Sequence, residues 1–205
     1  MAKKKTDEPK VYKEHPSVDQ RITDTLRENY MPYAMSVIVS RAIPEIDGFK
    51  PSHRKLLYTM YKMGLLNGNR TKSANIVGQT MKLNPHGDAA IYETMVRLTR
   101  GNEALLMPFV DSKGNFGKVY SRDMAYAAPR YTEAKLDAFC AELLRDIDTD
   151  AVDFVDNYDG EMKEPTLLPT TYPNILVSAN TGIAVGMASN FCGFNLAEVC
   201  RTTIE

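Results

Sequence analysis

The pattern of apolar and polar positions predicts two different elements on either side of Pro32. Residues 33–43 (YAMSVIVSRAI) are apolar on almost every face, which is typical of a buried helix, and Pro44 is expected to end it. Residues 17–31 mix β-branched and polar side chains and stop at Pro32. That mixture favours an exposed arm or an edge strand.

A turn and an amphipathic helix are predicted next. Asp47-Gly48 is a strong turn dipeptide. Ser52 is placed to cap a helix over 53–64, and Gly64 is placed to close it.

Two further helices are predicted on either side of a short turn. Residues 71–83 form the first, NPHG at 84–87 forms the turn, and residues 88–100 form the second, with Asp88 as its cap. Helix, short turn and helix is the pattern of a helix-turn-helix, although many helical hairpins look alike. In that motif the second helix lies on the DNA.

The pattern changes twice in the second half of the chain. Residues 104–120 read as short strands with turns and suit a β-ribbon, or wing. Residues 131–147 are predicted as an amphipathic helix, with one apolar face made of Leu136, Phe139, Cys140, Leu143 and Leu144. Prolines and β-type runs after Asp150 indicate a second domain, so the predicted fold class is α+β with a boundary near 150–165.

Composition narrows the class of protein. The 205 residues are 43% hydrophobic and carry a net charge of −1, but residues 33–100 hold ten basic and four acidic residues, while residues 151–205 hold two and seven. A basic segment in a neutral chain indicates a local anion site, with nucleic acid as the leading ligand and a solvated helix surface as the alternative. The three cysteines lack CxxC spacing, no apolar run is long enough to cross a membrane, and the N-terminus does not resemble a signal peptide. These features favour a reduced, cytoplasmic protein without a membrane partner.

Cations cluster where the helix over 53–64 begins. Lys50, His53, Arg54 and Lys55 oppose the helix dipole there. A bound polyanion would offset that unfavourable arrangement.

An Arg–Tyr pair in AAPRYTEAKL (127–136) is the candidate for chemistry. The hydroxyl of Tyr131 can attack a phosphodiester if cations stabilise the charge of the transition state. Arg130 supplies one cation beside it, and Arg41, Lys50, Arg54 and His86 supply others if the fold gathers them. The alternative is that Tyr131 only packs in the core.

A glycine-flanked apolar residue is the candidate for a wedge. Ile183 lies in TGIAVGM between Gly182 and Gly186 and suits insertion between base pairs, or else simple core packing. Asp156, Asp159 and Glu161 are interpreted as surface residues, so no metal site is predicted in this chain. A required metal is expected to come from another chain.

The motifs together resemble the N-terminal part of the A-type subunit of bacterial type IIA DNA topoisomerases, the gyrase and topoisomerase IV family. The resemblance covers roughly residues 20–200 and does not separate gyrase from topoisomerase IV. Its motifs occur in the family's order: YAMSVIVSRAIP, DGFKPSHRKLLY, KSANIVGQ, PHGDAAIYETMVRL, DSKGNFG, AAPRYTEAKL, DFVDNYDG and PNILVSANTGIAVGMASN.

The resemblance implies a domain plan. It implies a disordered tail at 1–18, an arm at 19–32 that docks on the B subunit, a winged-helix domain at 33–155, and the beginning of an α/β tower domain at 156–205. Most of the tower, the dimer gate and any DNA-wrapping domain are then expected to lie outside this chain, which by itself should not perform strand passage.

The resemblance also implies residue roles. Tyr131 matches the nucleophile that forms a 5′-phosphotyrosyl link, and Arg130 matches its neighbouring stabiliser, with Arg41 and His86 assisting. The DNA-contacting positions are Lys50, His53, Arg54, Lys55, Asn84 and the intercalating Ile183. The implied partners are double-stranded DNA and a B-type subunit with Toprim and ATPase domains, in an A2B2 heterotetramer associated with the chromosome. That subunit would bind most of the Mg²⁺ and all of the ATP.

The chain departs from the family's pattern at several of these positions. Asn84 replaces the first histidine of the usual HPHGD turn, and Lys55 replaces a common arginine, so a point charge stands where a bidentate fork is usual. Ala89 and Glu93 occupy the serine and acid positions that anchor quinolone drugs in the family. Without a hydroxyl at Ala89, weak quinolone binding is expected. The alternative function is a non-catalytic winged-helix module that binds DNA or the B subunit.

Overall fold

The computed structural model describes residue 17 and residues 19–205, in two units that divide at Tyr33 and Ala34. Apart from residue 17, the tail predicted at 1–18 lies outside the described residues. Within the described part of the chain, no helix is both long and apolar enough to cross a membrane.

An α-helix occupies the segment for which an arm or edge strand was predicted. Helix α1 covers Ile22–Val37, and a π-helical turn, Ile38–Ala42, continues it. The edge-strand prediction for 17–31 is therefore wrong, and Pro32 lies inside the helix. A proline inside a helix removes one backbone donor. Pro32 is exposed, so water can reach the carbonyl that loses its partner.

The helix predicted at 33–43 is present but is not buried. Ala34 and Ala42 are buried, whereas Met35 and Val39 are 50% and 52% exposed. The π-helical turn ends at Ala42, and Ile43 is extended, as expected for the residue before Pro44. An apolar run therefore gave the right element with the wrong surroundings.

Helix α2 (Pro51–Lys62) begins two residues earlier than predicted. Lys50 is its N-cap and Pro51 its first residue, so the prediction that Ser52 caps the helix is wrong. Proline suits this first position because its fixed φ is helical and its missing N–H has no partner there anyway. Gly64 follows the helix at φ +71°, which confirms its predicted role in ending it.

The predicted helix, turn and helix are confirmed with shorter boundaries. Strand β1 (Thr71–Lys72) precedes α3 (Ser73–Thr80), and α4 (Asp88–Leu98) follows the turn. Gly87 is the N-cap of α4, and Asp88 is its first residue rather than its cap. A carboxylate in the first turn still stabilises the helix dipole.

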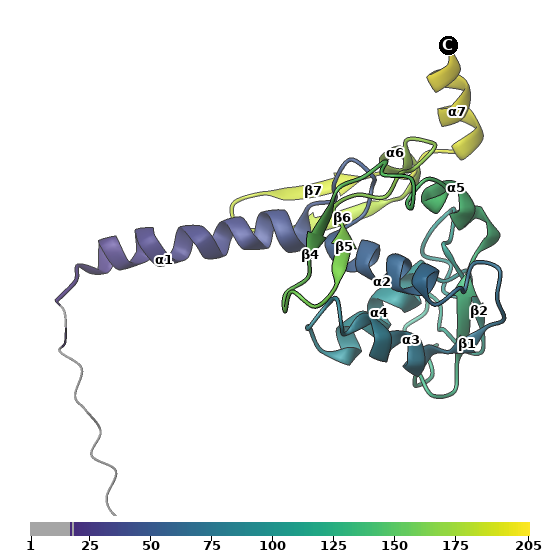
Figure 1. Ribbon diagram of the computed structural model, residues 1–205, viewed down its shortest axis with the longest axis horizontal. Coiled ribbons are helices and arrows are strands. Elements are labelled where there is room, and N and C mark those ends of the chain that lie inside the picture. The colour runs from purple at the N-terminus through teal and green to yellow at the C-terminus, as the bar shows by residue number, and fades with distance from the viewer. Residues whose placement is uncertain (1–16, 18) are drawn as a thin grey trace, which may run out of the picture. The chain divides into compact units, whose positions relative to one another are not determined.

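A three-stranded antiparallel sheet lies beside these helices, with strand order β1-β3-β2 (Figure 1). Strand β2 (Val110–Lys113) pairs with β3 (Glu133–Leu136), so that Val110 faces Leu136 and Lys113 faces Glu133. Strand β1 pairs with the other edge of β3. The ribbon prediction holds for β2, but its partner is β3, from farther along the chain.

The amphipathic helix predicted at 131–147 is wrong over its first half. Ala134 and Leu136 are buried and alternate with less buried neighbours, which is the period of a strand. Only a 3₁₀ turn, Ala138–Cys140, and the short helix α5, Ala141–Leu144, have helical geometry. The apolar residues from Leu136 onward follow the helical spacing, which hid the strand before them.

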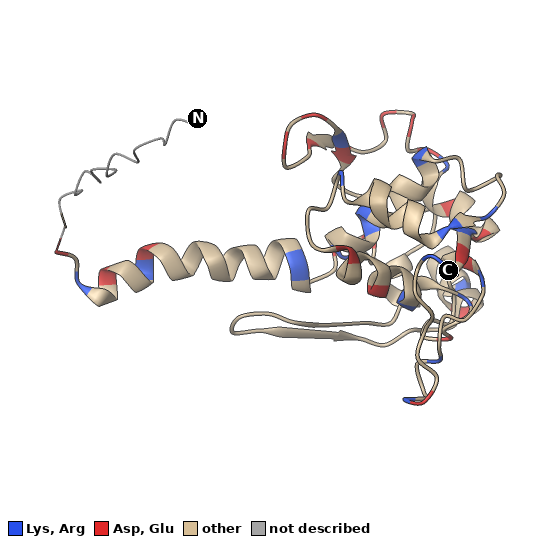
Figure 2. Cartoon of the chain, turned by 90° about the horizontal axis from the view of Figure 1, so that it is seen from below, with Lys and Arg blue, Asp and Glu red and all other residues tan. Residues whose placement is uncertain are grey.

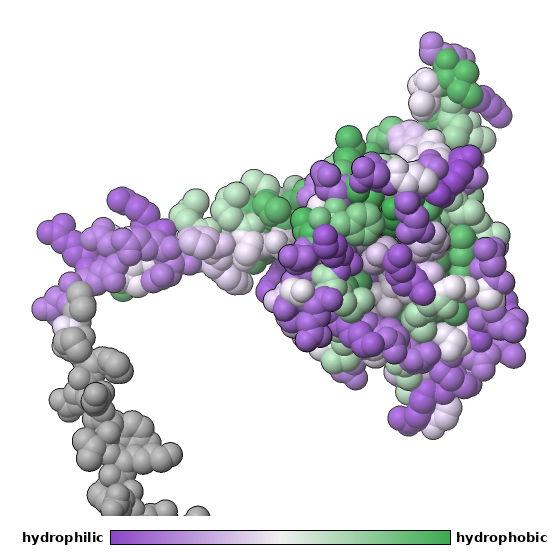
Figure 3. Space-filling view, in the orientation of Figure 1, coloured by the Kyte–Doolittle hydropathy of each residue, from purple (hydrophilic) through white to green (hydrophobic). Residues whose placement is uncertain are grey.

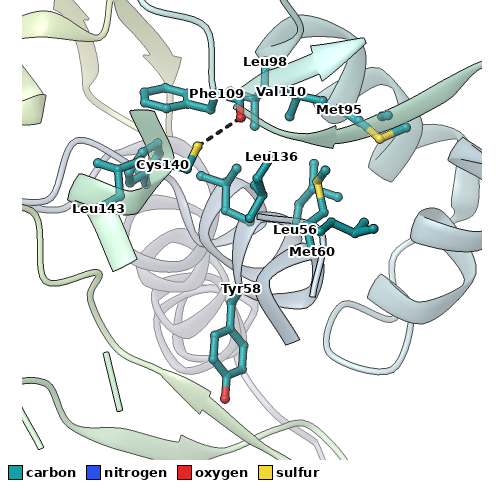
Figure 4. Packing of buried hydrophobic residues seen from close by; sticks show 14 of the residues in the cluster. Leu56, Tyr58, Met60, Met95, Leu98, Phe109, Val110, Leu136, Cys140 and Leu143 are labelled. Carbon is teal, nitrogen blue, oxygen red and sulfur yellow. Dashed lines mark hydrogen bonds between the residues drawn. The ribbon is translucent and has the colours of Figure 1, made fainter. Parts of the chain in front are cut away.

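One hydrophobic core joins the helices to the sheet (Figure 4). Leu56 of α2, Met95 of α4 and Leu136 of β3 are fully buried in it. The Cys140 thiol lies 3.0 Å from the carbonyl oxygen of Phe109, and burial raises its pKa to about 12. This cysteine is therefore a structural core residue.

The last fifty residues form small elements rather than one sheet. Two antiparallel hairpins, β4–β5 and β6–β7, alternate with two helices. The elements are β4 (Phe154–Asp156), β5 (Lys163–Pro165), α6 (Asn174–Val177), β6 (Asn180–Ile183), β7 (Ala188–Phe191) and α7 (Leu196–Ile204).

Gly182 brings the β6–β7 hairpin against the π-helical turn. A Cβ at this position would collide with the carbonyl oxygen of Ala42, so only glycine allows the close approach. The hairpin carries no charged residue along its length (Figure 2). Apolar surface lies around it and α6 in the space-filling view (Figure 3).

Candidate functional site

Tyr131 lies in a turn immediately before β3, not at the start of a helix. Its side chain is 65% exposed, which excludes the interpretation that it only packs in the core. Its backbone N–H donates to the carbonyl oxygen of Ala128 at 2.9 Å. The Arg130 guanidinium carbon lies 4.7 Å from the centre of the Tyr131 ring, within the range of a cation–π contact. The pair therefore stands together at the surface.

The backbone on either side of Tyr131 is fixed to the start of α3. The N–H of Ser73 donates to the carbonyl of Thr132 at 3.0 Å, and the N–H of Ala74 donates to that of Pro129 at 3.1 Å. Amides at a helix start have no partner within the helix. Here they hold the two carbonyls that flank the Arg–Tyr pair.

Lys50 and His53 lie on the outer side of the start of α2. The Lys50 ammonium donates to the carbonyl oxygen of Thr181 in β6 at 2.7 Å. Burial, followed by the charge of Arg97, lowers its pKa. Burial and the neighbouring cations Lys50, Arg97 and Arg54 lower the pKa of His53 to about 3, so its imidazole is neutral at pH 7.

Arg97 is a cation that the sequence analysis missed. It is exposed near the end of α4, and among the described residues it forms no ion pair or hydrogen bond. It is close enough to lower the pKa of both Lys50 and His53. Its spacing was a usable signal, since Ala89, Glu93 and Arg97 recur every four residues on one helix face.

Arg54 is turned into the fold rather than toward a ligand. Its guanidinium donates to both carboxylate oxygens of Asp47, at 2.8 and 3.0 Å, and both side chains are buried. Asp47 also accepts from the backbone N–H groups of Phe49 and Leu168, each at 3.0 Å. This cluster fastens the turn before α2 to the segment after β5.

Lys55 is likewise used within the fold. Its ammonium lies 2.9 Å from the carbonyl oxygen of Leu83 and 3.1 Å from the Glu164 carboxylate. Asn84, which follows Leu83 in the chain, is buried, and its backbone N–H donates to the carbonyl oxygen of Thr80. Of the predicted DNA-binding residues, Arg54, Lys55 and Asn84 thus form the interior behind the turn.

Arg41 and His86 are both exposed, in the π-helical turn and in the turn before α4 respectively. No contact between either side chain and Tyr131 is recorded among the described residues.

The two drug-site positions lie on the exposed side of α4. Ala89 is in the first turn, and Glu93 accepts a hydrogen bond from the Tyr126 hydroxyl at 3.2 Å. An open depression of about 730 Å³ lies beside this helix, with His53, Glu93, Arg97 and Tyr126 among its lining residues. The depression therefore brings Arg97 and His53 together with Glu93, one of the two predicted drug positions.

Ile183 lies at the end of β6, where the hairpin turns, and is 87% exposed. The core interpretation of this residue is excluded. Its side chain is uncovered at the turn of an uncharged hairpin, so the wedge role stays a prediction.

No group of three or more metal-ligating side chains is found among residues 17 and 19–205. Asp156, Asp159 and Glu161 are all exposed, in and beside the β4–β5 hairpin. The backbone N–H of Glu161 donates to the Asp159 carboxylate at 3.0 Å, within the turn of this hairpin.

These features define an α+β protein with an exposed Arg–Tyr pair and a cationic surface beside it. The family model for the A subunit of DNA gyrase/topoisomerase IV matches residues 41–205, and the chain belongs to this family.

Curated relatives agree with that assignment. The chain is 50% identical over 184 residues to the DNA gyrase A subunit of Staphylococcus epidermidis, an alignment that covers 88% of this chain and 20% of the relative. It is 48% identical over 190 residues to the DNA gyrase A subunit of Staphylococcus aureus, covering 91% of this chain and 21% of the relative. The chain thus spans about a fifth of the length of these relatives.

Proposed function

We propose that this chain carries the DNA-cleaving and rejoining tyrosine of an ATP-dependent type II DNA topoisomerase. The observation that carries the proposal is the exposed Tyr131 with the Arg130 guanidinium over its ring, in a member of this family.

The reaction is a reversible exchange of phosphodiester bonds. The Tyr131 hydroxyl oxygen attacks a backbone phosphorus as its proton leaves, an O–P bond forms, and the 3′ oxygen departs and gains a proton. The result is a 5′-phosphotyrosyl link and a free 3′ hydroxyl, and rejoining is the reverse. Arg130 is placed to stabilise the charge of the transition state. Arg41 and His86 are the assisting residues that the family resemblance implies.

DNA is proposed to run over the outward cations. In this proposal Lys50 and Arg97 contact phosphates as cations and the neutral His53 does so as a hydrogen-bond donor, because Arg97 lies close enough to lower the pKa of both other groups. Arg54, Lys55 and Asn84 act indirectly, since they build the turn and helix start that present Lys50 and His53. Ile183 inserts between base pairs and bends the duplex.

The domain assignment follows the same proposal. Helices α3 and α4 form a helix-turn-helix, β2 and β3 form the wing of a winged-helix domain at 33–155, and residues 156–205 begin an α/β tower. The helix pair and the antiparallel strands support this plan.

The proposed partners are double-stranded DNA and a B-type subunit, in an A2B2 assembly on the bacterial chromosome. Residues 19–32 form the docking arm for that subunit, which binds ATP and most of the Mg²⁺. The Mg²⁺ ion supplies positive charge near the reacting phosphate when bound.

The test is a covalent adduct assay. The native chain is mixed with its B-type subunit, Mg²⁺ and end-labelled DNA, and the reaction is stopped with denaturant. We expect protein attached to 5′ ends with wild type and none with Tyr131→Phe, which keeps the ring. Wild type that binds DNA but forms no adduct would favour the alternative, a non-catalytic winged-helix module that binds DNA or the B subunit.

A further inference from the structure

Thr132, the residue after the proposed nucleophile, is fully buried although it is polar and lies beside an exposed tyrosine. Its hydroxyl oxygen lies 2.8 Å from the Ser73 hydroxyl, at the start of α3, and 3.0 Å from the Tyr92 hydroxyl, on α4. Its methyl group packs on Gly114, where a Cβ would lie 3.3 Å away. Three separate segments of the chain therefore enclose one threonine.

The hydroxyl contacts continue to the backbone before Tyr131. The Tyr92 hydroxyl donates to the carbonyl oxygen of Ala127 at 2.7 Å. The Thr132 hydroxyl donates to the Ser73 hydroxyl, and in its contact with Tyr92 either oxygen can be the donor. Ser73, Thr132 and Tyr92 thus form a buried hydroxyl chain that reaches both sides of the Arg–Tyr pair.

The backbone contacts complete this support. With the amides of Ser73 and Ala74 included, residues 127, 129 and 132 are each hydrogen-bonded to α3 or α4. Tyr131 projects from the middle of this fixed segment, and its own side chain has no buried wall to orient it. The direction of its hydroxyl therefore depends on the backbone beneath it.

We propose that Thr132 is a positioning residue for Tyr131, and that its hydroxyl, held between Ser73 and Tyr92, sets the backbone that aims the nucleophile at the phosphate. The proposal rests on the proposed cleavage function. In-line attack requires close alignment of the oxygen, the phosphorus and the leaving group, and a misplacement of about 1 Å can cost on the order of 100-fold in rate. Thr132 itself does not touch the DNA.

The native chain offers a matched pair of variants. Thr132→Val keeps the shape and removes the hydroxyl, whereas Thr132→Ser keeps the hydroxyl and removes the methyl. Tyr92→Phe removes the donor to Ala127 and one of the two hydroxyl partners of Thr132. Each is assembled with the B-type subunit, and the rates of adduct formation and of rejoining are measured at saturating DNA, together with DNA affinity and the unfolding midpoint.

We expect Thr132→Val to slow cleavage by about tenfold or more. Rejoining should slow by the same factor, because both directions cross the same transition state, so the fraction of adduct at equilibrium stays unchanged. Thr132→Ser should return both rates to within a few-fold of wild type, and DNA affinity should hold throughout. A threonine that only supports the fold would instead give losses that follow the unfolding midpoint in both variants.

Two results overturn the proposal while leaving the proposed function intact. One is a Thr132→Val enzyme that cleaves at wild-type rate. The other is a Thr132→Ser enzyme as slow as Thr132→Val. If Thr132→Val does not fold, Tyr92→Phe carries the test, and wild-type rates for that variant overturn the proposal. Wild type that binds DNA without forming an adduct overturns the proposed function, and this proposal with it.

Discussion

The starts of α2 and α4 are two helix N-termini built in opposite ways. The start of α2 carries three cations that oppose its dipole, Lys50, Arg54 and Lys55, and the last two are held by carboxylates of the fold. The start of α4 carries Asp88, which favours its dipole, and residues 85–90 are all exposed. The start of α2 is therefore partly tied into the fold by ion pairs, whereas the start of α4 is exposed to solvent.

The difference teaches how one charge cluster can serve two purposes. Lys50, His53, Arg54 and Lys55 are near neighbours in sequence, but the fold turns the first two outward and the last two inward. Counting charges in the sequence alone predicts that all four side chains bind a polyanion. The ion pairs show that two of the three cations, Arg54 and Lys55, are already offset inside the protein.

The largest effect is expected where the inward cations are broken. Arg54→Ala leaves the Asp47 carboxylate buried without its cation, and losing one member of a buried pair costs about 3–5 kcal/mol of folding stability. Urea unfolding measures this loss. Lys50→Ala, the outward control, should cost less, because it removes one hydrogen bond to the carbonyl of Thr181 and leaves no buried charge unpaired. Equal losses in the two variants would erase the distinction between inward and outward cations.

The outward cations should instead govern DNA binding. Arg97→Ala is expected to weaken binding about equally for all sequences and to reduce the slope of log K against log salt by roughly 0.9. Lys50→Ala should behave in the same way, because the two side chains lie on one surface. Titration with duplex DNA at several salt concentrations measures both slopes. An unchanged slope for Arg97→Ala would place the DNA elsewhere.

A pH dependence should follow from His53. Its pKa is about 3 in the folded protein, below the ordinary value of 6.5. Between these two values the unfolded chain binds more protons, so stability falls as pH drops from about 6.5 toward 3. His53→Gln should flatten this part of the stability curve, as measured by unfolding at each pH. A curve of unchanged steepness would show that His53 is not the group responsible.

Local patterns in the sequence predicted what local physics decides. Gly64 ends α2 because its left-handed φ suits glycine, and the pair of helices around 84–87 follows from hydrophobic period and turn residues. The Arg–Tyr pair was also identified from sequence. Its interpretation as the start of a helix failed because strand pairing of β3 with β1 and β2 decides that segment, and those partners are distant in sequence.

The supporting contacts could not be read from the chain. Thr132 meets partners 59 and 40 residues earlier, and nothing in its own neighbourhood indicates them. The same holds for Arg54 and Arg97. The sequence does not show that Arg54 forms an ion pair with Asp47 while Arg97 stays exposed, because the fold decides this. The prediction that residues 33–43 are buried failed for a related reason. An apolar run shows that a helix can be buried, but not whether another part of the described chain covers it.

The smallest effect on folding is expected at the open start of α4. Ala89→Ser adds a hydroxyl at an exposed position, so stability should change by less than about 0.5 kcal/mol. The family resemblance gives this position a serine that helps to anchor quinolone drugs. The same substitution should therefore raise drug-stabilised cleavage several-fold in the enzyme assembled with its B-type subunit, scored as adduct formed at a fixed drug concentration. A serine can act there because α4 leaves the position uncovered, with Glu93 one turn further along the same face. Drug-stabilised cleavage that is the same with alanine and serine would show that the open surface is not the drug-binding surface, and the contrast between the two helix starts would then concern folding alone.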